Sequence, residues 1–138
     1  MMGKTKYTST VTANIKKRRL YITLKGIIPK KEADRLYTDI RFCVSDLEPG
    51  FTVITDLTQC RIGHLNGIST ARKIMQFLLE KKVGKIIRII GQGKVIYLQM
   101  LKLSDKMNGY DPKYVATLEE AEKLLDELSK EESAASAA

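Results

Sequence analysis

Residues 51–68 read FTVITDLTQCRIGHLNGI, and this stretch decides the fold class. It opens with the β-forming residues 51–55, whose mixed apolar run is typical of a strand buried on both faces. The strand is predicted to end at Asp56, and a loop that contains His64 then leads to a helix that begins at Gly67. A strand that ends in an acid and feeds a loop–helix connection commonly presents a binding site in α/β proteins.

Strands and helices are predicted to alternate on either side of this stretch. Two alternating runs, at 7–15 and 20–24, flank the basic residues 16–19 and predict an antiparallel hairpin with a solvated tip. Helices with apolar residues at helical spacing are predicted at 29–47, 67–82, 95–108 and 118–130. Two further strands are predicted between them, at 85–90 and 113–116. The predicted order is ββαβαβαβα, an α/β domain with a mixed, mostly parallel sheet of about five strands and four helices.

Three hydrophobic patterns place particular elements. Residues 85–90 read KIIRII, which is apolar on both faces and predicts a strand inside the sheet, whereas the clean alternation of 7–15 predicts an edge strand. The apolar positions that mark the third helix are Val95, Leu98 and Leu101, with Met100 as a further member. Thr117 and Glu120 form a capping box that begins the fourth helix.

Length and composition indicate one domain. The chain has 138 residues, 43% of them hydrophobic, which is enough for a core without disulfides or metal. We assign 1–6 to an N-terminal extension, 7–130 to the domain and 131–138 to a disordered polar tail. The densest apolar run is short and interrupted by Arg88, so no membrane span is expected. Without a secretory signal pattern, the expected location is the cytoplasm.

The charge of the chain is unevenly distributed. The net charge is +8, residues 1–31 hold nine Lys or Arg and no acid, and residues 117–138 hold seven acids and two lysines. This polarity could steer an anionic partner toward the basic hairpin, although a plain lysine-rich surface is the alternative. The scattered tyrosines argue against specific nucleic-acid binding.

Catalytic and metal-binding patterns are scarce. His64 is the one histidine, so a histidine-based metal cluster is excluded, and no metal, cofactor or catalytic residue is predicted. Cys43 lies on an apolar helix face and is predicted to be buried, whereas Cys60 falls in the predicted loop and is open to exposure. A nucleophile–base pair of Cys60 and His64 is an alternative, but a chance meeting of residues in one loop is the favoured interpretation.

A glycine-containing turn follows residues 85–90. Its Gly91, Gly93 and Lys94 precede a helix, where backbone amides can approach an anion. The turn lacks both the upstream glycine and the hydroxyl residue of a P-loop. A plain turn is therefore the favoured interpretation, and a weak anion contact is the alternative.

Three stretches together resemble a known family. They read LYITLKGIIPKKEADRL at 20–36, VITDLTQCRIGHLNGI at 53–68 and YVATLEEAEKLL at 114–125. In order and spacing they are similar to the STAS domain, the fold of the anti-sigma factor antagonists and of the cytoplasmic tails of sulfate transporters. The closest group is that of the divergent, single-domain bacterial proteins, and the resemblance covers residues 7 to about 128.

The resemblance also bears on the loop before the second helix. Asp56 matches the family's acid at the strand end, and Gly67 matches its helix-opening glycine. Where the family reads Asp-Ser-Ser-Gly, this chain ends its loop in Asn66-Gly67, so the serine that a partner kinase phosphorylates is an asparagine. Because asparagine has no hydroxyl, that modification cannot occur at this position. Ser69 and Thr70 could substitute, but hydroxyls in a first helical turn are more often caps.

The sequence therefore predicts a non-catalytic regulatory domain that binds another protein of unknown identity. The contact surface is expected to combine the loop with the exposed part of helix 67–82, and its residues are Asp56, His64, Asn66, Gly67, Ser69, Thr70, Arg72, Lys73, Gln76 and Glu80. The second hypothesis is a small-ligand or lipid-headgroup carrier, which an apolar cavity between helices and sheet would favour. The ligand and the oligomeric state, a homodimer included, are left open.

Overall fold

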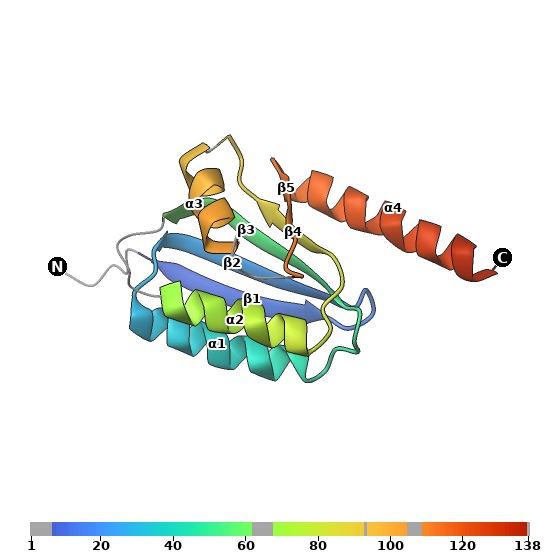
Figure 1. Cartoon of the computed structure of the whole chain (residues 1–138), viewed down its shortest axis with the longest axis horizontal. Helices are drawn as coiled ribbons and strands as arrows, with labels where there is room; N and C mark the ends of the chain where they lie inside the picture. The colour runs from blue at the N-terminus through green and yellow to red at the C-terminus, as the bar shows by residue number, and fades with distance from the viewer. Residues whose placement is uncertain (1–6, 62–67, 93, 105–108, 138) are drawn as a thin grey trace.

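The computed structural model describes residues 7–61, 68–92, 94–104 and 109–137, and it confirms the predicted order ββαβαβαβα. The elements, coloured along the chain in Figure 1, are β1 (Thr8–Asn14), β2 (Arg19–Ile27), α1 (Lys30–Val44), β3 (Thr52–Arg61), α2 (Ile68–Glu80), β4 (Ile86–Ile89), α3 (Lys94–Ser104), β5 (Lys113–Val115) and α4 (Leu118–Ala137). The forward bond of the predicted capping box is present, since the Glu120 amide donates a hydrogen bond to the Thr117 hydroxyl at 3.1 Å.

The sheet is mixed and mostly parallel, with the order β1-β2-β3-β4-β5. β1 is antiparallel to β2 at one edge, and the remaining strands are parallel to one another. β4 lies between β3 and β5, so both placements predicted from the hydrophobic patterns are confirmed. Because each right-handed connection steps one strand in the same direction, α1, α2 and α3 all cover one face. α4 follows the last strand and covers the other face (Figure 1).

Two apolar cores result from this arrangement. The larger core packs Leu20 and Val53 of the sheet against α1, α2 and α3. The smaller core packs Ile54, Ile87 and Ile89 against α4. Because helices cover both faces of β4, all four of its residues are buried, which is why three of them are isoleucines on both faces of the strand.

β3 is longer than the sequence predicts. It runs to Arg61, so Asp56 lies within the strand and not at its end. β4 pairs only with the first half of β3, whereas β2 continues to pair with it beyond a register shift between Thr23 and Lys25. Cys60 is consequently a buried strand residue, while Cys43 is only half-buried, the reverse of the expectation for the two thiols.

Two helices also differ from expectation. Leu98 and its apolar neighbours Val95 and Leu101 are exposed. Of the predicted positions on α3 only Met100 is buried, together with Ile96 and Leu103. α4 continues to Ala137, through residues that the sequence assigned to the tail. Alanine and glutamate are good helix formers, which accounts for the longer helix.

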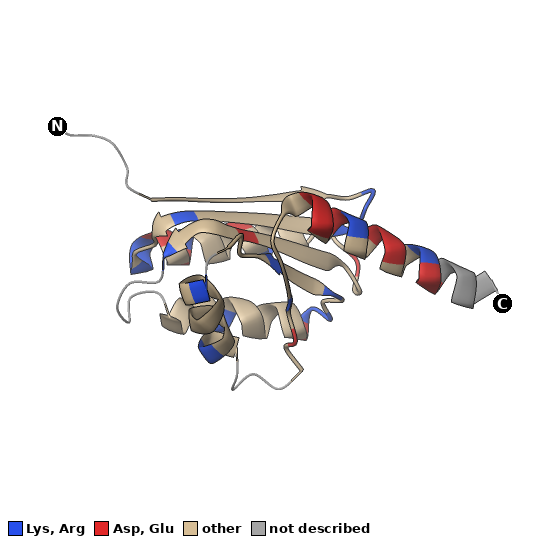
Figure 2. Cartoon of the chain, turned by 90° about the horizontal axis from the view of Figure 1, so that it is seen from above, with Lys and Arg blue, Asp and Glu red and all other residues tan. Residues whose placement is uncertain are grey.

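The basic hairpin and the acidic last helix contact each other (Figure 2). Arg19, predicted at the solvated tip, begins β2 and is only 3% exposed. Its guanidinium donates to Glu122 at 2.6 Å and to Asp126 at 3.3 Å, and Lys17 lies 3.7 Å from Glu122. Part of the charge polarity seen in the sequence is therefore satisfied within the domain.

A hydrogen-bonded carboxylate ties the edge strand β1 to α1. The Ser9 hydroxyl donates to Glu32 Oε2 at 2.7 Å, and the Arg35 guanidinium donates to both oxygens of Glu32, at 3.0 and 2.6 Å. The Arg35 guanidinium, followed by the Ser9 hydroxyl, lowers the pKa of Glu32 from 4.5 to about 2. Glu32 therefore stays ionised well into the acid range in the folded chain.

We expect this contact to make the free energy of unfolding depend on pH in the acid range. A carboxylate whose pKa is lower in the folded than in the unfolded chain stabilises the fold above the unfolded pKa, and that stability is lost as the pH falls from 4.5 toward about 2. Glu32→Gln should lower the free energy of unfolding at neutral pH by about 1–2 kcal/mol and flatten its slope in this window. Urea unfolding at a series of pH values measures both quantities. The exposed carboxylate variant Glu48→Gln should retain the wild-type slope, and a wild-type slope in Glu32→Gln would contradict the assignment.

Candidate functional site

The contact surface predicted from the sequence lies partly on α2. The residues His64, Asn66, Gly67 and Gly93 lie outside the described part of the chain. Five predicted contact residues on α2 are exposed to solvent: Ser69, Arg72, Lys73, Gln76 and Glu80. Gln76 donates a hydrogen bond to Glu80 at 3.4 Å. In the glycine-containing turn, Gly91 is half-buried with φ of 58°, and Lys94 is exposed at the start of α3.

Two predicted contact residues are instead engaged within the domain. Thr70 is 1% exposed, and its hydroxyl donates to Asp34 Oδ1 at 2.6 Å, which ties α2 to α1. The Lys30 ammonium, followed by the Thr70 hydroxyl, lowers the pKa of Asp34. Asp56 is half-buried and accepts hydrogen bonds from the amide and hydroxyl of Thr58, at 3.0 and 2.7 Å. The Thr70 side chain is therefore inside the domain, whereas Asp56 keeps part of its carboxylate at the surface.

The Cys60 thiol has the electrostatic surroundings of a structural cysteine. Burial raises its pKa to about 11, so at neutral pH it is a protonated thiol and a weak nucleophile. Within the described ranges, no three His, Cys, Asp or Glu side chains gather closely enough to hold a metal ion.

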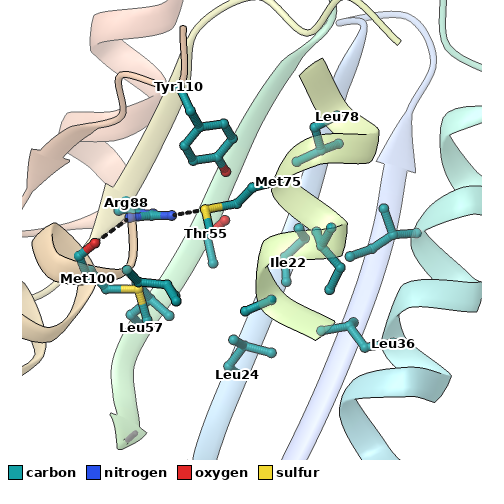
Figure 3. Close-up of a pocket in the computed structure, with 14 residues that line it drawn as sticks. Ile22, Leu24, Leu36, Thr55, Leu57, Met75, Leu78, Arg88, Met100 and Tyr110 are labelled. Atoms are coloured by element: carbon teal, nitrogen blue, oxygen red, sulfur yellow. Dashed lines mark hydrogen bonds between the residues drawn. The ribbon is translucent and has the colours of Figure 1, made fainter. Parts of the chain in front are cut away.

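A cavity lies between the sheet and the helices that cover its larger core (Figure 3). Its volume is about 90 Å³, and its walls come from β2, β3, β4, α1, α2 and α3 together with Tyr110. Apart from Thr55, Arg88 and Tyr110, the lining is apolar and consists of Ile22, Leu24, Leu36, Ile40, Leu57, Ala71, Ile74, Met75, Leu78, Met100 and Leu103. The cavity thus has an apolar body and one polar side.

Arg88 supplies the charge on the polar side of this cavity. It belongs to β4, where Ile87 and Ile89 face α4, so the alternation of the strand turns Arg88 toward α2 and α3. It is 5% exposed, and Nη1 donates to the Ser104 hydroxyl at 2.7 Å and to the Tyr114 hydroxyl at 2.9 Å.

Further neutral groups surround the guanidinium. Nη1 also lies 3.4 Å from the Met100 carbonyl oxygen, and Nη2 lies 3.6 Å from the sulfur of Met75. The guanidinium carbon lies 5.4 Å from the ring centre of Tyr110. No Asp or Glu among the described residues is within ion-pair distance of Arg88. Reasoning from the sequence missed this residue, and the one signal for it was a single charge inside the run KIIRII.

None of the helices in the described residues has both the length and the apolarity needed to cross a bilayer. No protein-family model matches the chain, and no curated protein matches it. What can be said of its function therefore rests on the α/β fold and on the two sites described above, the exposed face of α2 and the cavity at Arg88.

Proposed function

We propose that the chain is a non-catalytic regulatory domain of STAS-like type that binds another protein in the cytoplasm. The observation that carries this proposal is the exposed face of α2, where Arg72, Lys73 and Gln76 point to solvent while Met75 and Leu78 anchor the opposite face in the core. The two cations have no acidic partner at ion-pair distance among the described residues, so an acidic surface of a partner could meet them. The order of strands and helices is compatible with the STAS-like assignment.

Charge reversal on α2 tests this proposal. We expect Arg72→Glu combined with Lys73→Glu to weaken binding of the partner by about tenfold or more, because two attractive contacts become repulsive. The measurement compares the proteins retained from native lysate by the immobilised wild type and by the variant, followed by titration of the purified partner.

The matched control reverses two charges on the other face of the sheet. Lys123→Glu combined with Lys130→Glu changes exposed residues of α4 and should leave the affinity unchanged. If the α2 variant retains the same proteins with the same affinity as the wild type, the proposed surface is wrong. The basic residues 16–18 of the hairpin then become the next surface to test.

The cavity favours a second candidate function, a carrier of a small apolar ligand. A domain with a fully packed core has no space between helices and sheet, whereas this one retains about 90 Å³. We expect small apolar probes to shift the methyl NMR signals of Met75 and Met100, which line the cavity. Ala71→Leu should fill the cavity and abolish these shifts, and absence of shifts in the wild type would rule this candidate out.

A further inference from the structure

Among the described residues, no acidic side chain compensates the charge of Arg88 at the cavity. Burying a guanidinium is costly unless a counter-ion and hydrogen bonds replace its water. Ser104 and Tyr114 supply hydrogen bonds, and Tyr110 supplies an aromatic face, but all three are neutral. If residue 88 only filled space at the centre of the sheet, leucine or methionine would be buried at a lower cost in free energy than arginine. The arrangement therefore suits a ligand that brings a negative charge.

The donors of Arg88 are unequally satisfied, which indicates where such a ligand would bind. Nη1 has two hydroxyl acceptors at 2.7 and 2.9 Å. In the described ranges the acceptor of Nη2 is the sulfur of Met75 at 3.6 Å, and a thioether is a weak acceptor. Figure 3 shows this contact on the cavity side of the guanidinium, with the Tyr110 ring beside it. An oxygen anion in place of the sulfur would be the better partner for Nη2.

Thr55 adds a second polar group to the same wall. In the parallel pairing of β3 with β4, Thr55 is the partner of Arg88, and both residues line the cavity. A hydroxyl beside a guanidinium can donate to the second oxygen of a carboxylate. The polar side of the cavity thus offers donors for both oxygens of one carboxylate group.

The remaining walls restrict the rest of the ligand. The lining contains one cation, so a dianion such as a phosphate monoester would bring a second charge without a partner. The volume of about 90 Å³ is smaller than an engineered cavity of about 150 Å³ that takes up the six carbons of benzene, which limits an apolar tail to about four carbon atoms.

We propose that this cavity binds a short-chain monocarboxylate, with the carboxylate on Arg88 and Thr55 and the apolar tail between α2 and the sheet. The proposal rests on the second candidate function, that of a small-ligand carrier, and names the chemical class of its ligand. It assigns Arg88 as the residue that selects the anion over a neutral molecule of the same shape.

A matched pair of probes tests the assignment. Isovalerate and isovaleramide have the same skeleton, but only the first is charged at neutral pH. We expect the wild type to bind isovalerate about tenfold more tightly than isovaleramide, as followed by the methyl signals of Met75 and Met100. In Arg88→Met the two affinities should become equal. Arg41→Met makes the same substitution at an exposed arginine of α1 and should retain the wild-type preference.

The outcomes separate this proposal from the function on which it rests. Equal affinities in the wild type, or a preference that survives Arg88→Met, would overturn the role of Arg88 while leaving a small-ligand carrier in place. Failure of both probes to bind the wild type would overturn both. If Arg88→Met does not fold, Arg88→Lys keeps the charge but loses the forked donors, and its preference for isovalerate should fall below that of the wild type.

Discussion

Leu78→Ala should lower the free energy of unfolding by about 4 kcal/mol, near the upper end for truncation of a buried leucine. Leu78 is 1% exposed on α2 and forms part of the cavity wall. The cost of such a truncation rises with the volume left empty, because the surroundings relax only partly. Here the new gap would merge with a cavity of about 90 Å³ that the neighbours already leave open. Urea unfolding of the purified variant measures the loss.

The chain offers a matched control for this substitution. Leu98 lies on α3 and is 58% exposed, so Leu98→Ala should change the free energy of unfolding by no more than about 0.5 kcal/mol. The comparison also tests which face of α3 is buried. Equal losses in the two variants would mean that Leu98 packs in the core, as its place in the apolar pattern of the sequence suggested.

The strand order could be predicted because its signals are local. Isoleucines on both faces over 85–90 and a strict alternation over 7–15 each report how many faces of a strand are covered. Helices of crossover length between the strands then restrict the connections to right-handed parallel ones. These signals need only a few neighbouring residues, and the structure confirms both placements.

The buried face of α3 could not be predicted in the same way. Its sequence KVIYLQMLKLS has apolar residues on every side, so helical periodicity selects no face. The contact of α3 with the sheet is what buries Ile96, Met100 and Leu103. The second half of β3 was missed for a related reason, since Thr58 and Gln59 are polar and only pairing with β2 keeps them in the strand.

The candidate site depends on contacts that are distant in the sequence. Arg88 is recognisable as a lone charge in an apolar run, but its hydrogen-bond partners Ser104 and Tyr114 follow 16 and 26 residues later. The same holds for Arg19, whose partner Glu122 lies 103 residues away. The local charge pattern predicted that Arg19 lies in a solvated turn. In the folded chain it is instead a buried cation that pairs with Glu122.

Glu122→Ala should therefore lower the free energy of unfolding by about 3 kcal/mol, because it leaves the buried guanidinium of Arg19 without its closer counter-ion. Glu122 accepts from Arg19 at 2.6 Å and from the Tyr21 hydroxyl at 2.9 Å, so a buried donor and a half-buried donor lose their acceptor together. Asp126 at 3.3 Å continues to pair with Arg19, which keeps the loss from being larger. Chemical denaturation at neutral pH gives the value.

Two further variants identify charge pairing as the cause. Glu127→Ala removes an exposed carboxylate from the same helix and should change stability by no more than about 0.5 kcal/mol. Adding Arg19→Met to Glu122→Ala should recover most of the loss, because a buried methionine needs no counter-ion, whereas the stranded guanidinium does. A double variant less stable than Glu122→Ala alone would show that Arg19 stabilises the sheet–helix contact by packing and by its bond to Thr52, and not by its charge.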